Sequence, residues 1–320
     1  MRHETLVELA ERDRIRLPAA LREDWPPELS AADKKGWFRF RRLYDIARSV
    51  LRTEADVRRL VRQAAEDDVL DGSGWTEIQV DPSGYAARFG GITAFTDLVL
   101  DAVREAEAAT GLRMAVVIAA NRTRHPLDAR TLARLAAQYA GRGVVGFGLS
   151  NDERRGRAED FAPAFDIARR AGLASLPHGG ELRGAGSAAA CLSALHADRL
   201  GHGVRCVEDP AVLARVVDAG IPLEVCPVSN VALGVYATIE EVPLPLLLAA
   251  GVPVALGADD PLLFGSRLAG QYAVARAAYD LDDGTLAELA RMSVRSSLAP
   301  EDVRTRLLRG IDAWLATDPA

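Results

Sequence analysis

Short β-rich apolar runs alternate with longer amphipathic segments over most of the chain. From about residue 75 onward the runs predict seven strands, at residues 76–80, 115–119, 144–149, 174–177, 199–201, 223–226 and 254–257. Between them, apolar residues recur at helical spacing at 94–109, 128–139, 161–171, 187–195, 210–219 and 244–250. This order of elements predicts a parallel sheet built from βα units.

Both ends of the chain have helical patterns only. They predict helices at 4–14, 37–51 and 54–67, and again at 267–281, 285–298 and 301–315. Within the alternating region, Asp209 is placed to cap a helix that begins at Pro210 and ends at Gly220. Because a closed βα barrel usually has eight strands, we expect a single α/β domain over residues 1–320, one strand short of a complete barrel.

Composition and charge narrow the functional classes. The formal net charge of −6 argues against nucleic acid or an anionic membrane as the main partner. The longest uncharged stretch, residues 242–258, contains prolines and is too short to span a membrane. No secretory signal is visible, and the three cysteines follow no disulfide or zinc-knuckle spacing, so we expect a cytoplasmic protein with Cys191, Cys206 and Cys226 in its core.

Ionisable residues follow three of the predicted strands. They are His178 and Glu181, His202, and the adjacent pair Asp259 and Asp260. In a parallel barrel the carboxyl ends of the strands form one face, where reactive groups gather. Imidazole and carboxylate groups suit Zn²⁺. Each residue also has a structural explanation, as a buried histidine, a turn residue between glycines or a helix cap, but their occurrence together at strand ends favours a site.

Four ordered motifs resemble the adenosine deaminase family of the amidohydrolase superfamily. They are PHGGE (177–181), DRLGHGVR (198–205), PLEVCPVSN (222–230) and ALGADDP (255–261). The resemblance extends to residues 37–81, 144–153 and 292–301 and thus covers nearly the whole chain. It implies a TIM-type (β/α)8 barrel and hydrolytic deamination of the 6-amino group of a purine, a small-molecule substrate.

The resemblance assigns a role to each candidate. His178 and Asp259 match metal ligands, Glu181 the acid that protonates the purine ring nitrogen N1, and His202 the group that orients and deprotonates the metal-bound water. Asp260 matches the aspartate that hydrogen-bonds purine N7. One Zn²⁺ lowers the pKa of its water toward ~7, so hydroxide attacks C6 and ammonia leaves. A purine is a poor electrophile until its ring nitrogen is protonated, so Glu181 must be buried to stay protonated.

One departure from the family concerns the metal. The family's first strand carries a His-x-His pair of ligands, whereas residues 2–15 here resemble the helix that follows that strand. His3 and His125 are not placed to replace the pair. We expect either that the protein is longer and the sequence begins at an internal methionine, which we favour, or that the chain is a metal-poor, non-catalytic purine-binding relative.

A second departure concerns the substrate. Ser150 and Asn151 stand where the family often has Ala-Gly, whose glycine amide contacts the purine face, so Asn151 is a candidate substrate-binding residue. PHGGE and LGADDP replace the commoner HAGE and NTDDP, which indicates a divergent subgroup. Adenosine is the default substrate, and adenine and aminodeoxyfutalosine are alternatives.

Overall fold

The computed structural model describes residues 1–30 and 35–317, and its centre is one parallel sheet. Seven strands follow each other in sequence order across this sheet. Their bounds are β1 Trp75–Val80, β2 Arg113–Asn121, β3 Val144–Ser150, β4 Ala174–Gly179, β5 Leu200–His202, β6 Leu223–Val225 and β7 Val254–Leu256. All seven predicted strands are therefore present, most within two residues of the expected bounds.

The two edge strands leave the barrel open. Each strand pairs in parallel with the next, from Trp75↔Arg113 between β1 and β2 to Val225↔Leu256 between β6 and β7. Within the described part of the chain β1 and β7 do not pair with each other, so the sheet curls without closing. The prediction of a TIM-type barrel that lacks one strand is confirmed.

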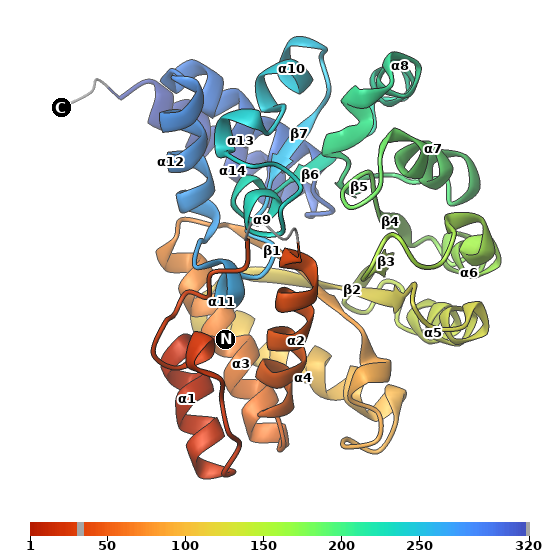
Figure 1. Cartoon of the computed structure of the whole chain (residues 1–320), viewed down its shortest axis with the longest axis vertical. Helices are drawn as coiled ribbons and strands as arrows, with labels where there is room; N and C mark the ends of the chain where they lie inside the picture. Colours follow the sequence, from red (N-terminus) through yellow and green to blue (C-terminus); the bar gives the residue numbers. More distant parts are fainter. Residues whose placement is uncertain (31–34, 318–320) are drawn as a thin grey trace.

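Helices cover the outside of the sheet, and several follow one another along an arc (Figure 1). They are α4 Ile92–Thr110, α5 Pro126–Gln138, α6 Ala158–Arg170, α7 Ala185–Ala194, α8 Pro210–Asp218 and α10 Leu244–Ala249. As predicted, Asp209 caps α8, where its side chain accepts the amide of Ala211 at 2.9 Å. Two further short helices were not predicted: α9 (Pro227–Ala232), which begins two residues after β6 ends, and α11 (Pro261–Phe264), which begins five residues after β7 ends.

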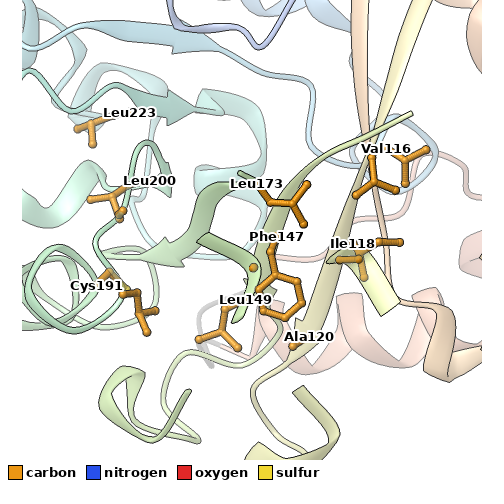
Figure 2. Packing of buried hydrophobic residues seen from close by; sticks show 14 of the residues in the cluster. Val116, Ile118, Ala120, Phe147, Leu149, Leu173, Cys191, Leu200 and Leu223 are labelled. Carbon is orange, nitrogen blue, oxygen red and sulfur yellow. The ribbon is translucent and has the colours of Figure 1, made fainter. Parts of the chain in front are cut away.

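The main core lies between the sheet and these helices. Figure 2 shows Ile118 and Ala120 of β2 beside Phe147 and Leu149 of β3, and all four are fully buried or nearly so. Phe147 also meets the edge of Phe165 on α6, with ring centroids 5.0 Å apart. Seven consecutive residues of β2 are buried, so this strand contacts protein on both faces and its sequence is a continuous apolar run.

The terminal helices form further layers beside the sheet. The N-terminal helices α1 His3–Arg12, α2 Gly36–Ser49 and α3 Glu54–Leu70 enclose a second apolar cluster that α11 joins. The C-terminal helices are α12 Leu268–Tyr279, α13 Asp283–Ser296 and α14 Glu301–Leu315, and α13 packs against β7. The three cysteines are free and buried, as expected. Among the described residues no helix is both long and apolar enough to cross a membrane.

Candidate active site

Four of the six candidate residues meet at the carboxyl ends of the strands. His178 lies near the end of β4, Glu181 follows in the loop, His202 ends β5, and Asp259 follows β7. The Nε2 atom of His202 lies 3.5 Å from Oε1 of Glu181 and 4.0 Å from Oδ2 of Asp259. The rings of His178 and His202 have centroids 5.2 Å apart. Parallel pairing of β4 with β5 sets His178 opposite Gly201, the residue before His202, so the two histidines lie at adjacent strand ends.

Glu181 is a buried carboxyl group, one oxygen of which has no hydrogen-bonding partner among the described residues. Its exposed fraction is 4%, and its Oε1 atom has no hydrogen bond. Burial raises the pKa of Glu181 to about 7, because the charged form loses its hydration. A carboxyl group that is partly protonated near neutral pH can donate a proton to a bound ligand.

A second buried glutamate holds the loop that carries Glu181. The Glu153 carboxylate accepts the backbone amides of Gly180 at 2.5 Å, Glu181 at 2.9 Å and Arg183 at 3.0 Å. Three such bonds to one carboxylate hold the backbone of the loop from which the Glu181 side chain extends. No sequence motif identifies a role for Glu153. Its only distinguishing feature in the sequence is its position, three residues beyond the end of β3.

His202 is held in a left-handed backbone conformation between two glycines. Its φ is 61°, and its side chain is buried beside Glu181 and Asp259. Burial alone would lower the pKa of His202, but the nearby carboxylates of Glu181 and Asp259 raise it overall. The side-chain amide of Asn230, on α9, lies 3.3 Å from its Nδ1 atom. Rotating that amide would present oxygen instead, so Asn230 can face either the neutral or the protonated ring.

His178 has the properties of a neutral imidazole. Burial, and then the neighbouring His202, lowers the pKa of His178 to about 4. Its Nδ1 atom is buried without a hydrogen-bonding partner. Gly201 leaves room for this ring, since a Cβ atom at that position would lie 2.8 Å from Nδ1 of His178. Neutral imidazole is the form that binds metal ions.

The described residues fit a zinc ion only in part. His178 and Asp259 are suitable donors, and the unpartnered ring atom of His178 leaves that side chain free for a ligand. A catalytic zinc site normally has three protein ligands. Residues 1–30 and 35–317 contain no group of three or more His, Cys, Asp or Glu side chains that could hold a metal ion. A complete site would therefore need further ligands.

The remaining two candidates lie at the ends of β7 and β3. Asp260 caps α11 by accepting the amide of Leu263 at 3.3 Å, which is the structural role that its position before Pro261 indicated. Burial, and then the adjacent Asp259, raises the pKa of Asp260 to about 6. The side chain of Asn151 accepts the amide of Asp152 at 2.8 Å, and among the described residues it makes no hydrogen bond to the other candidates.

Backbone strain marks the same places. Within the described residues, positive φ values occur at six non-glycine positions, and Asn151 (82°), His202 (61°) and Asp259 (57°) are three of them. Such conformations cost free energy and concentrate at functional sites. This observation is independent of the side-chain chemistry and points to the same strand ends.

Comparisons with known proteins agree over nearly the whole length of the chain. A family model described as adenosine deaminase matches residues 1–314. A putative adenosine/adenine deaminase of Streptomyces virginiae is 63% identical over 315 residues, which are 98% of this chain and 93% of that protein. An adenine deaminase of Chelativorans sp. (strain BNC1) is 39% identical over 265 residues, or 82% of this chain and 81% of that protein.

Solved structures give the same result. The crystal structure of adenine deaminase from Arthrobacter aurescens superposes with a TM-score of 0.90 at 30% identity, and the match covers 99% of this chain and 95% of that one. The chain belongs to the adenosine deaminase family.

Proposed function

We propose that this protein hydrolyses the 6-amino group of a purine to a carbonyl group and releases ammonia. The buried pair of Glu181 and His202 carries the proposal: a carboxyl group with an unpartnered oxygen lies 3.5 Å from an imidazole at the carboxyl ends of the strands. The reaction consumes one water and forms one ammonia, so protons must move both to the ring and to the leaving amine.

Glu181 would supply the proton to the purine ring. Addition of water to C6 places negative charge on the ring nitrogen, and a neutral carboxyl group beside that nitrogen can neutralise it. The raised pKa of Glu181, about 7, keeps a large fraction of the carboxyl group protonated at neutral pH. The Glu153 carboxylate holds the loop and thereby keeps Glu181 in place.

His202 would orient the attacking water and accept its proton. The Nε2 atom lies 4.0 Å from Oδ2 of Asp259, whose carboxylate favours a positive charge on the ring. Asn230 at Nδ1 would then act as a positioning residue for this imidazole. Asp260 and Asn151, at the neighbouring strand ends, would bind the purine.

His178 and Asp259 would hold a zinc ion together with ligands beyond those that the described residues provide. When bound, such an ion supplies a water molecule of lowered pKa. The low pKa of His178, about 4, keeps its ring neutral and available as a donor over the whole neutral range.

We infer adenine and adenosine as the two candidate substrates. Adenosine is the family's default. Adenine is favoured by the names of the relative from Chelativorans and the solved structure from Arthrobacter, whereas the name of the relative at 63% identity covers both.

The proposal is tested by incubating the protein, supplemented with Zn²⁺, with adenine, adenosine and aminodeoxyfutalosine in parallel. We expect ammonia release from at least one of them, together with the ultraviolet change of the purine. Binding of a purine without ammonia release, by protein shown to contain zinc, would contradict the proposal and favour a non-catalytic purine-binding protein.

A further inference from the structure

A cavity of about 220 Å³ lies where α6 and α7 begin, beside the loop that carries Glu181. Its lining includes five charged side chains, Arg122, Glu153, Arg157, Glu159 and Arg183. The two helices are neighbours on the outside of the sheet (Figure 1). None of the six candidate active-site residues lines this cavity.

Both helix ends at the cavity lack a side-chain cap. α6 has 13 residues and follows Arg157, and α7 has ten residues and follows Gly184. No side chain of either preceding residue accepts a hydrogen bond from the first turn, although their backbone carbonyls accept the amides of Asp160 and Ser187. The first amides of a helix have no partner within the helix, and the helix dipole makes this end positive. Two such ends at one cavity favour an anion there.

Arg122 is an independent sign of a ligand. Its side chain is 2% exposed, it lines the cavity, and its Nε atom has no hydrogen-bonding partner. The guanidinium donates a hydrogen bond to the backbone carbonyl of His178. Among the described residues Arg122 has no carboxylate within ion-pair distance. A buried charge without a counter-charge is costly, so an anion in the cavity would be stabilised.

The two carboxylates at the cavity are already engaged. The Glu153 carboxylate accepts three backbone amides, from Gly180, Glu181 and Arg183. Glu159 lies 3.4 Å from Arg157. In the described structure no carboxylate forms an ion pair with Arg183, so two of the three arginine charges at the cavity are uncompensated by a close partner.

We propose that this cavity is a binding site for a tetrahedral oxyanion, either free phosphate or the phosphate group of a small metabolite. The planar guanidinium groups of Arg122 and Arg183 are donors that recognise phosphate oxygens in proteins. The positive N-terminal ends of α6 and α7 add to the attraction for an anion. The site is separate from the one proposed for the purine, but its Arg122 contacts the backbone of His178, so the two share a wall.

The test measures the melting temperature of the full chain with inorganic phosphate and with ribose 5-phosphate. The reference is sodium chloride at equal ionic strength, and EDTA is present so that phosphate cannot bind through a metal ion. The double variant R157A/R183A removes two exposed cavity arginines. R170A, at the other end of α6, is the matched control because Arg170 is exposed and does not line the cavity.

We expect phosphate to raise the melting temperature of the native chain and of R170A. In R157A/R183A the dissociation constant should rise at least about tenfold, because each lost contact is a hydrogen bond between charged groups. Tighter binding of ribose 5-phosphate than of phosphate would assign the site to a phosphorylated metabolite, and equal binding would assign it to the free ion. A native chain that phosphate stabilises no more than chloride, or a double variant that binds as tightly as the native chain, would overturn the proposal.

Discussion

At the scale of single residues, burial sets the chemistry of the site. Glu181 and Glu153 are both buried glutamates, in the loops after β4 and β3 respectively, yet their environments differ. Glu153 accepts three backbone amides, whereas Oε1 of Glu181 has no partner. Hydrogen bonds stabilise the charged form of a carboxyl group, whereas burial without hydrogen bonds destabilises it. The two glutamates can therefore have different roles. Glu153 can hold the loop, and Glu181 can act as an acid.

The activity should therefore fall as the pH rises through about 7. Burial in the folded protein raises the pKa of Glu181 to about 7. Glu181 is therefore protonated and able to donate a proton at lower pH, and it loses this proton as the pH rises above that value. The measurement is kcat against pH for a purine that the protein deaminates, with zinc saturating throughout. A kcat that stays constant or increases from pH 6 to pH 9 would be inconsistent with Glu181 as the proton donor.

Several functional residues depend on partners that are distant in the sequence. Glu181 and His202 could be singled out because each lies at the end of an apolar run. Asn230 and Glu153 could not be assigned roles from their positions, because the partner of Asn230 is His202 and those of Glu153 are amides of the β4 loop. The same holds for Arg122, which contacts the carbonyl of His178. Only the strand pairing brings these groups together. The roles of the six candidate residues stay predictions.

At the scale of the elements, length decides what the sequence pattern predicts. Helices α4 and α3 have 19 and 17 residues, so their apolar positions repeat often enough to be recognised. Helices α9 and α11 have six and four residues and contain too few turns for any period. Both begin at a proline in the loop after a strand, and this proline is the sequence feature that indicates the start of each helix.

The start of α3 allows a quantitative prediction on stability. Asp56 is 3% exposed, completes a capping box with Thr53, and pairs with Arg12 of α1 at 2.6 Å. Burial alone would raise the pKa of Asp56, but the hydrogen bonds from Arg12, Arg52 and Thr53 lower it well below the usual range. D56N should lower the free energy of unfolding at pH 7 by about 2 kcal/mol.

This contribution has a defined pH dependence. Because the folded pKa of Asp56 is lowered, its stabilisation is complete above the unfolded value of about 3.9 and is lost as the pH falls further. Urea unfolding of the native chain, D56N and the exposed control E54Q, at pH 7 and at pH 3, measures it. The gap between native and D56N should shrink at pH 3, and a gap that widens there would contradict this assignment.

At the scale of the whole molecule, an ion-pair network inside the curled sheet links strands that are far apart. Arg199, at the start of β5, lies 2.5 Å from Glu77 of β1 and 2.6 Å from Glu224 of β6. Glu77 also accepts the amide of Leu298, which follows α13. The edge strand β1 is thus held to the opposite side of the sheet and to the C-terminal helices, although it does not pair with β7.

Removing Arg199 should therefore destabilise the whole fold. R199M leaves Glu77 and Glu224 poorly hydrated and without their cation. Because the loss of one member of a buried ion pair typically costs about 3–5 kcal/mol, we expect the free energy of unfolding to fall by about that amount. The exposed R170A serves as the control. Chemical unfolding monitored by circular dichroism measures the effect. A loss below about 1 kcal/mol would mean that the network does not hold the open sheet together.

The number of available ligands sets how tightly the proposed zinc ion would be held. That the whole chain forms one domain stays a prediction, as does the zinc ion. With His178 and Asp259 as the available donors, a chain of residues 1–320 alone should hold zinc weakly and release it on dialysis, since tight sites need at least three protein ligands. Metal analysis before and after dialysis, with D259A for comparison, tests this. One tightly held equivalent would show that further ligands are present.

The role of Glu181 as the group that protonates the purine during hydrolysis can be measured by replacing its carboxyl group with an amide. Ammonia release from adenine and adenosine is measured, at saturating zinc, for the native chain, for E181Q and for the exposed control E54Q. Because E181Q removes the acid and keeps the shape, kcat should fall by about 10²–10⁴, while E54Q should equal the native chain. A native rate in E181Q would contradict the account.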